Sequence, residues 1–287
     1  MIELRAGEVS ARIAPAEGGR IVGLVIAGRE RLVSRERARA HEPPLYWGCY
    51  PMVPWAGRLD HGRIPTPEGE VRLEANLAPS AIHGLAFDKP WTVTETSDKA
   101  LTMSCELRGL GWPFGGRARQ RLRLGARRLD LELVVDGYAK SGPVGLGWHP
   151  WFARPDRGDV ELRVDASSVL ALDADLVPTG ETRSVTPRED LRAGPALGDR
   201  RLDHVYVRAR SPAVLRWPDL ELRIEYEPIL ETVVVHTPPE GVCVEPQTMW
   251  PNAPLLAAGG VAGTGLRTLE PGERLRVSEA WSWTPRT

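Results

Sequence analysis

Apolar residues recur at every second position along much of this chain, whereas the 3.6-residue period of helices is scarcely present. In one segment, Leu101, Met103, Cys105 and Leu107 alternate with small or polar residues. Because successive side chains of a strand point to opposite faces of a sheet, this period predicts strands with one buried and one solvated face. The same alternation occurs at 122–124, 129–135, 160–164, 205–207, 220–224 and 275–277. The pattern therefore predicts an all-β protein.

Turn residues separate these segments, because most of the 26 prolines and 29 glycines lie between them. Gly125-Ala126 is expected to form the turn of a hairpin, and Glu30–Ala40 a loop or a single helical turn. Further turns are expected at Pro65–Gly69, Pro178–Gly180, Pro238–Gly241 and Pro271-Gly272. Many short strands with frequent turns are typical of a sandwich or a barrel.

The continuity of the chain favours one domain over two. All-β folds can reach ~250 residues as a single unit, and this chain has 287 residues. It contains no low-complexity linker and no repeat of fixed period. Residues 1–287 are therefore expected to form a single β-sandwich domain.

Charge and composition exclude several classes of protein. The 37 basic and 38 acidic residues are spread along the chain and give a formal net charge of -1, so no nucleic acid partner is expected. The longest uncharged stretch, 246–266, contains three prolines and four glycines, so no membrane-spanning helix is expected. The N-terminal segment 1–15 mixes acids and bases, unlike a signal peptide, which predicts a cytoplasmic location.

The three cysteines, Cys49, Cys105 and Cys243, lie far apart in the sequence and form no CxxC pair. This spacing favours neither a disulfide framework nor a metal site built from thiolates. We expect buried thiols in a reducing compartment.

Candidate functional residues lie where a β protein places loops or strand ends. Among the histidines His61, His83 and His149, the last is the best placed, because the following proline restricts its backbone to an extended shape. Glu245 ends an apolar run, so partial burial should make it resist ionisation, which suits a general base near neutral pH. A strand-end carboxylate paired with an arginine is the alternative for Glu245. Two further candidates could equally be surface charges: Arg58 and Asp203.

Six motifs in this order resemble the aldose 1-epimerase (galactose mutarotase) family, from about Ala11 to Trp283. They are Gly-Arg58-Leu, His83-Gly84 followed by Trp91, Gly-Trp-His149-Pro-Trp-Phe, Leu-Asp203-His-Val-Tyr, Val-Glu245-Pro-Gln-Thr and Leu-Glu-Pro-Gly272-Glu. His-Pro-aromatic-Phe and Glu-Pro-x-Thr at this separation are specific together, although each is weak alone.

The resemblance implies a large antiparallel β-sandwich, the galactose mutarotase-like supersandwich, in agreement with the strand pattern. It also implies an isomerase that interconverts the α and β anomers of an aldose or a related sugar. In that role Glu245 is the base and His149 is the acid. The resemblance further assigns sugar hydroxyls to four residues: His83, Arg58, Asp203 and Gln247. No metal or other cofactor is implied, since both proton-transfer groups are side chains, and the oligomeric state is open.

Some positions depart from the family pattern, which leaves the identity of the sugar open. Gly57 stands where many relatives have Asn, Trp151 replaces the commoner Tyr, and Met249-Trp250 stand where small residues are frequent. Tryptophan rings suit the apolar faces of sugars. We expect at most two or three pocket residues among the tryptophans near the motifs, which are Trp47, Trp55, Trp148, Trp151 and Trp250.

Three other functions are open at this point. A glycoside hydrolase could use Asp203 and Glu245 as its two carboxylates. A metalloenzyme of the jelly-roll type could draw ligands from His83, His149 and Glu245, although such histidines usually lie close together in sequence. A non-catalytic sugar-binding protein could keep the pocket without turnover.

Overall fold

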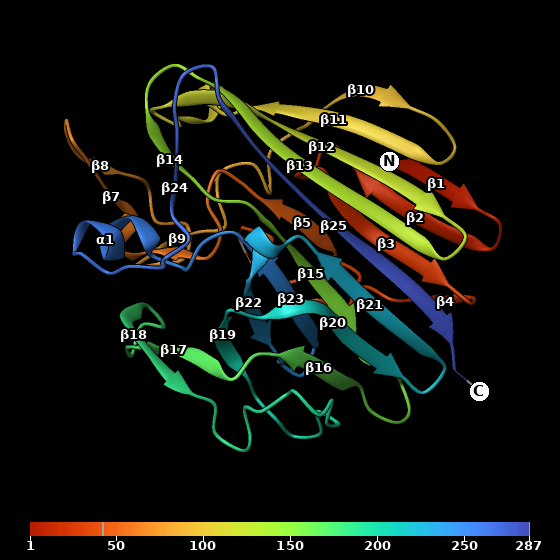
Figure 1. Ribbon diagram of the computed structural model, residues 1–287. Helices are drawn as coiled ribbons and strands as arrows, with labels where there is room; N and C mark the ends of the chain where they lie inside the picture. The colour runs from red at the N-terminus through yellow and green to blue at the C-terminus, as the bar shows by residue number, and fades with distance from the viewer. Residues whose placement is uncertain (42, 287) are drawn as a thin grey trace.

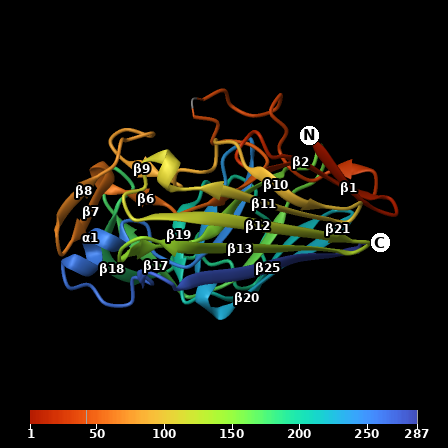
Figure 2. The same ribbon diagram turned by 90° about the horizontal axis from the view of Figure 1, so that it is seen from above.

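The computed structural model describes residues 1–41 and 43–286, which fold into two large antiparallel β-sheets. Figure 1 shows the smaller sheet in front of the larger one, and Figure 2 shows the same layers from above. The smaller sheet has the order β10 (Thr92–Thr96), β11 (Ala100–Glu106), β12 (Gly115–Gly125), β13 (Arg128–Tyr138), β25 (Arg274–Pro285), β21 (Leu220–Tyr226), β20 (Arg210–Trp217) and β16 (Glu161–Asp165).

The larger sheet has 11 strands. Its order is β1 (Ile2–Ala6), β2 (Val9–Ala14), β3 (Arg20–Ile26), β5 (Cys49–Met52), β15 (Gly147–Ala153), β23 (Gly241–Gln247), β22 (Thr232–His236), β19 (Asp203–Val207), β17 (Ser168–Leu172) and β18 (Pro178–Ser184), with β4 (Arg29–Glu30) paired to β3. The all-β sandwich predicted from the sequence is confirmed.

Short elements lie around these sheets. Three two-stranded sheets pair β6 (Arg58–Leu59) with β9 (Ala81–Ile82), β7 (Arg63–Thr66) with β8 (Gly69–Arg72), and β14 (Gly142–Val144) with β24 (Arg267–Leu269). The helical elements are α1 (Ala253–Ala258) and the 3-10 turns Asp60–Gly62, Arg108–Leu110 and Pro228–Leu230. Among the described residues, no helix is both long enough and apolar enough to cross a lipid bilayer.

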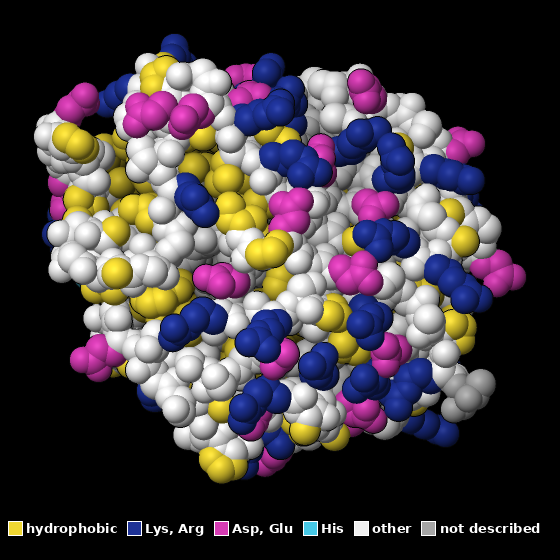
Figure 3. Space-filling view, in the orientation of Figure 1, with side chains coloured by type: hydrophobic (Ala, Val, Ile, Leu, Met, Phe, Trp, Pro, Cys, Tyr) yellow, Lys and Arg dark blue, Asp and Glu magenta, His cyan; other side chains and the backbone are white. Residues whose placement is uncertain are grey.

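The smaller sheet has one buried and one solvated face, as the alternation predicts. Leu101, Leu122 and Leu131 lie opposite one another on β11, β12 and β13, and all three are buried. The other face carries interleaved basic and acidic side chains (Figure 3), such as Arg276, whose Nε lies 2.7 Å from Glu132 Oε2. The hairpin between β12 and β13 is confirmed, with its turn at 126–127 and Gly125 closing the strand pair.

The centre of the larger sheet is buried on both faces, in two strands that lie outside the alternating segments of the sequence. Every residue of β15 and β23 is buried. Trp148 points between the sheets, where its Nε1 donates to Gln120 Oε1 at 2.8 Å. Trp151 packs on the opposite face with Leu45 and other apolar residues of the segment before β5, whose described residues are 31–41 and 43–48. That segment lies on the side of the larger sheet away from the smaller sheet (Figure 2) and shields the second face from water.

One predicted turn is also wrong, because Pro178–Gly180 lies within β18. β18 is the last strand of the larger sheet, and Pro178 is its first residue. A proline is tolerated at the start of an edge strand because its missing N–H costs no ladder hydrogen bond there. The predicted turn at Pro238–Gly241 is confirmed, and the three cysteines are buried free thiols, as expected.

Candidate active site

A pocket of about 280 Å³ opens on the face of the larger sheet that points away from the smaller sheet. This volume is just below the roughly 300 to 1,000 Å³ of typical small-molecule sites, which suits one small ligand. Its floor comes from β15, β23, β22 and β19, and its walls come from β6, β9, the β17–β18 hairpin and the segment before β5. The pocket therefore collects residues from most of the length of the chain.

Strand register explains why distant residues meet on this floor. Residues that lie opposite one another on adjacent strands share a face of the sheet. One row across the four strands consists of Trp151, Cys243, His236 and Asp203. The next row on the same face includes Glu245, Val234 and Val205. The pairing of the strands thus places a row that contains His236 and Asp203 beside a second row, which consists of the carboxyl group of Glu245 and two valines.

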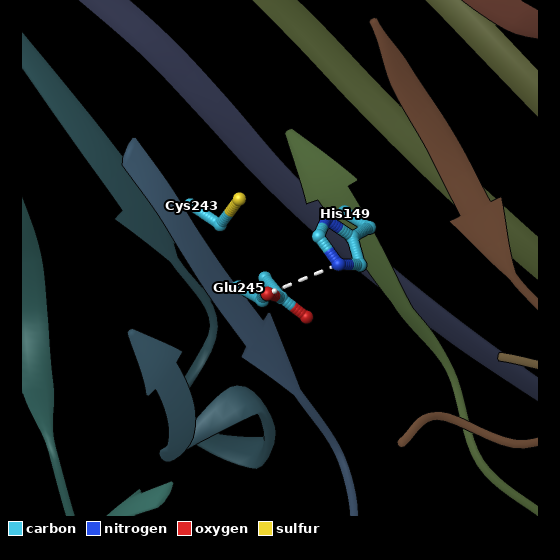
Figure 4. A group of neighbouring side chains, drawn as sticks. All are labelled: His149, Cys243 and Glu245. Carbon is cyan, nitrogen blue, oxygen red and sulfur yellow. Dashed lines mark ion pairs between the residues drawn. The ribbon is translucent and has the colours of Figure 1, made fainter. Parts of the chain in front are cut away.

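Glu245 and His149 touch each other at the bottom of the pocket. His149 Nε2 lies 3.3 Å from Glu245 Oε1 (Figure 4), and both side chains are almost completely buried. The imidazole ring stacks on Trp151, with centroids 5.5 Å apart, and packs against Tyr50 at 4.9 Å. These two rings fix the orientation of His149 toward the carboxyl group.

Burial controls the protonation of this pair. Loss of hydration raises the pKa of Glu245 well above its usual range, the negative charge of Asp203 raises it further, and Arg58 opposes both. Burial also lowers the pKa of His149 well below its usual range, and the neighbouring His83 adds to the effect. The two groups together therefore favour their neutral forms, with one proton on the carboxyl group, when the pocket is empty.

The small sheet β6–β9 supplies Arg58 and His83 to the wall. Arg58 lies opposite Ile82, so the next residue, His83, enters the pocket beside it. The backbone of His83 adopts φ +60°, which is uncommon for a residue with a side chain, and its N–H donates to Gly57 O at 3.0 Å. Burial first, and then the charge of Arg58, lower the pKa of His83 to about 3. His83 is therefore a neutral hydrogen-bonding group.

The structure explains why position 57 is occupied by glycine. Its φ of +72° lies in the left-handed region that favours Gly and, among other residues, Asn. A Cβ atom at Gly57 would lie 2.7 Å from Pro251 Cγ, so a larger residue does not fit here. The next residue after that proline, Asn252, donates its backbone N–H to Arg58 O at 2.6 Å. Gly57 thus allows the close packing of Pro251 and Asn252 that holds the backbone of Arg58.

The structure adds His236, which the sequence analysis did not single out. Its Nδ1 lies 3.6 Å from Asp203 Oδ2, and its ring meets Trp151 edge-on, with centroids 5.7 Å apart. Burial lowers its pKa, and the charge of Asp203 opposes this shift. A signal existed in the sequence: His236 follows the apolar run Val233–Val235 and precedes a proline-rich turn.

Five of the predicted site residues line the same pocket: Arg58, His83, His149, Asp203 and Glu245. Gln247 is not in the lining, because it is fully buried and its Nε2 donates to Met249 O at 2.7 Å. Its predicted contact with the sugar stays a prediction without geometric support. His61 lies at the surface against Asp60. Of the five tryptophans near the motifs, Trp151 lines the pocket.

A possible metal-ligand group differs from the one considered from the sequence. Among the described residues, His149, Cys243 and Glu245 bring ligand atoms within 4.8 Å of one another. His83 is not part of this group, although its ring lies 4.8 Å from that of His149.

A larger depression, of about 430 Å³, lies over the smaller sheet. Several of its charged groups are paired with each other: Arg128 Nη1 lies 2.7 Å from Glu225 Oε2, and Arg276 Nε lies 2.7 Å from Glu132 Oε2. Such surface pairs are well hydrated, and although the buried Glu279 also lines this depression, no histidine lies there to act as the second proton-transfer group. The smaller pocket is therefore the candidate active site.

Comparison with known proteins finds two similar sequences from one bacterium. YphB, an uncharacterized protein of Escherichia coli K12, is 32% identical over 107 residues, which are 36% of this chain and 36% of YphB. YihR, a second uncharacterized protein of that bacterium, is 24% identical over 185 residues, which are 62% of this chain and 59% of YihR. The chain therefore spans about a third of YphB and about three fifths of YihR.

Solved structures share the fold across the whole chain. The GalM/aldose epimerase homologue from C. elegans superimposes with a TM-score of 0.84 at 17% identity, covering 100% of this chain and 99% of that one. Galactose 1-epimerase from Lactobacillus acidophilus NCFM gives 0.80 at 18% identity, covering 99% and 94%. A family model described as aldose 1-epimerase matches residues 1–280. This chain belongs to the aldose 1-epimerase family.

Proposed function

We propose that this protein is a mutarotase, which interconverts the α and β anomers of an aldose or a related sugar. The observation that carries the proposal is the buried contact of 3.3 Å between His149 Nε2 and Glu245 Oε1 at the bottom of a pocket of monosaccharide size. Ring opening needs one group that takes the proton of the C1 hydroxyl and one that protonates the ring oxygen. A carboxylate and an imidazolium side by side supply both.

Glu245 and His149 share one transferable proton, which can lie on either residue. In the neutral form the proton is on Glu245, and burial favours this form when the pocket is empty. Sugar hydroxyls that donate to the carboxylate, together with the positive charge of Arg58, favour the ionised form. Proton transfer across the contact then makes Glu245 a base and His149 an acid before the reaction begins.

The reaction runs in two halves. Glu245 removes the C1 hydroxyl proton while His149 protonates the ring oxygen, so that the bond between C1 and the ring oxygen breaks and an open aldehyde forms. Rotation about the bond between C1 and C2 presents the other face of the aldehyde. The same two residues then exchange roles, and the ring closes as the other anomer.

The remaining polar residues hold the sugar in this proposal. Among the described residues, the guanidinium of Arg58 makes no ion pair, so its donors are available to sugar oxygens. Asp203, oriented by His236, accepts hydroxyl protons, and neutral His83 serves as a hydrogen-bonding partner. The ring of Trp151 offers an apolar surface for the C–H groups of the sugar.

NMR exchange spectroscopy of anomers across a panel of sugars tests the proposal. The panel contains neutral hexoses, deoxy sugars, keto sugars and sugar phosphates, each compared with the uncatalysed rate in the same buffer. We expect acceleration for at least one class. Binding of a sugar with no acceleration for any member of the panel would instead identify a non-catalytic sugar-binding protein. Release of aryl alcohol from nitrophenyl glycosides would identify a glycoside hydrolase.

A further inference from the structure

We propose that the pocket floor is also a binding site for a thiophilic divalent cation such as Zn²⁺, held by Cys243, His149 and Glu245. We infer further that this cation switches the enzyme off. The metal site stands on geometry alone, whereas the inhibition rests on the proposed function. Cys243 is the residue of this group that the proposed reaction does not use.

The three side chains are brought together by the sheet. Cys243 and Glu245 are two residues apart on β23 and therefore point to the same face, while His149 lies on the neighbouring strand β15. Each offers one ligand atom, and all three atoms lie within 4.8 Å of one another. Figure 4 shows the sulfur, the carboxyl group and the imidazole on the same side of the two strands.

The ligand set matches the coordination chemistry of zinc. A thiolate, an imidazole and a carboxylate are the three side-chain ligands that Zn²⁺ prefers, and Zn–ligand bonds of ~2.0 to 2.3 Å in a tetrahedron place ligand atoms roughly 3.3 to 3.8 Å apart. His149 Nε2 and Glu245 Oε1 are already 3.3 Å apart. The sulfur of Cys243, which lies within 4.8 Å of both atoms, must move closer to them as the metal binds. The fourth position faces the pocket, where a water molecule or a solute can enter.

A second observation concerns the other carboxyl oxygen of Glu245. Glu245 is 1% exposed, and among the described residues its Oε2 atom has no hydrogen-bond partner. Buried polar atoms are nearly always paired, so this oxygen is an available acceptor or metal ligand. Cys243 is fully buried beside it and forms no disulfide.

The exchange of protons for the metal conserves charge. One divalent cation enters, and the thiol proton of Cys243 and the carboxyl proton of Glu245 leave as the two ligands form their metal bonds. No uncompensated charge is added to the buried floor, which would otherwise be costly. Because Glu245 and His149 are then both ligands, neither can transfer a proton to or from a sugar, so the metal and the sugar compete.

Cobalt binding tests the site without any assay of activity. Co²⁺ bound to a thiolate gives a near-ultraviolet charge-transfer band, and we expect one Co²⁺ per chain, displaced by Zn²⁺. The band should disappear in Cys243→Ala. The matched control is Cys49→Ala, since Cys49 is an equally buried thiol in the same sheet that points to the opposite face, between the two sheets. Thermal unfolding confirms that both variants are folded.

Inhibition is the second readout. Zn²⁺ should slow anomer exchange by the wild-type protein, and a chelator should restore the rate. Cys243→Ala should keep the metal-free rate and lose sensitivity to Zn²⁺ by more than the ~10- to 100-fold typical of changes outside the coordination shell. An absent cobalt band, or an unchanged band in Cys243→Ala, would refute the site. If no sugar is turned over, the cobalt spectra still decide the metal site, and the proposed function alone fails.

Discussion

Two glutamates, Glu245 and Glu279, are buried on β23 and β25, and they have different surroundings. Glu245 lies in the pocket with His149 Nε2 at 3.3 Å. Glu279 points between the two sheets, where its Oε1 accepts a hydrogen bond of 3.0 Å from Trp281 Nε1. Burial raises the pKa of both carboxyl groups, to about 8 for Glu279, and the bond from Trp281 opposes this shift.

The comparison shows that burial changes the proton affinity of a carboxyl group without making it a catalyst. Among the described residues, Glu279 has one tryptophan N–H as its hydrogen-bond partner, and the depression over the smaller sheet that it lines contains no histidine. Glu245 has an acid, a cation at the pocket wall and a cavity that admits a sugar. The neighbouring imidazole, rather than the shifted pKa, therefore distinguishes a general base from a structural carboxyl group.

The largest expected effect is that of Glu245→Gln on turnover. The amide keeps the size of the side chain but cannot accept the C1 hydroxyl proton, so kcat for anomer exchange should fall by ~10²- to 10⁴-fold. Glu279→Gln is the matched control and should leave kcat within about twofold. NMR line-shape or exchange measurements at saturating sugar check both. Near wild-type turnover in Glu245→Gln would show that Glu245 is not the base. Equal losses in both variants would show that burial alone determines the effect.

His149→Asn should have the next largest effect. The ring oxygen loses its proton donor, and water in the pocket is a poorer replacement, so kcat should fall by at least ~10²-fold while sugar affinity changes less. His61→Asn is the control, because His61 is exposed and lies outside the pocket. The ratio of kcat to KM effects, measured by progress curves in a polarimeter, separates proton transfer from binding. A rise in KM with unchanged kcat would make His149 a binding group.

A smaller effect is expected for Arg58→Ala. Charge-assisted hydrogen bonds contribute about 1.5 to 3 kcal/mol each, so the loss should raise KM roughly 10- to 100-fold and lower kcat less. The control is Arg276→Ala, which removes an arginine paired with Glu132 on the outer face of the smaller sheet. A large fall in kcat at saturating sugar, with KM unchanged, would contradict a holding role for Arg58.

The sequence predicts the smaller sheet better than the larger one. In β11 to β13 one face meets water, so the alternation around Leu101 and Leu122 shows directly which side is buried. At the centre of the larger sheet both faces are covered, and the segment Gly147–Ala153 has no period-2 alternation that could separate core from surface. The motifs still pointed to Glu245 as the candidate base and His149 as the candidate acid, because the residue types and the order of the motifs were specific.

The parts of the site that sequence reasoning missed depend on contacts between distant strands. His236 meets Asp203 only through the register of β19 and β22, and no local pattern encodes that register. Likewise, the fit of Pro251 against Gly57 depends on where two separate segments pack. Single-chain patterns predict which residues share a face of one strand, but they do not state which strands become neighbours.

Glu279→Gln should have the smallest effect on turnover. It should instead change how the free energy of unfolding depends on pH. The folded protein holds a proton on Glu279 up to about pH 8, whereas the carboxyl group ionises near 4.5 without burial. The unfolded chain therefore binds fewer protons between these values, and the free energy of unfolding falls as pH rises from about 4.5 to about 8. Glu279→Gln removes this dependence, because the amide does not ionise. Urea unfolding at about pH 5 and pH 9 should show the variant gaining stability relative to wild type, on the order of a few kcal/mol at the higher pH. If the difference in stability between the variant and wild type does not change with pH, Glu279 ionises in the folded protein much as it does in water. Glu245 and Glu279 would then differ in burial as well as in their partners.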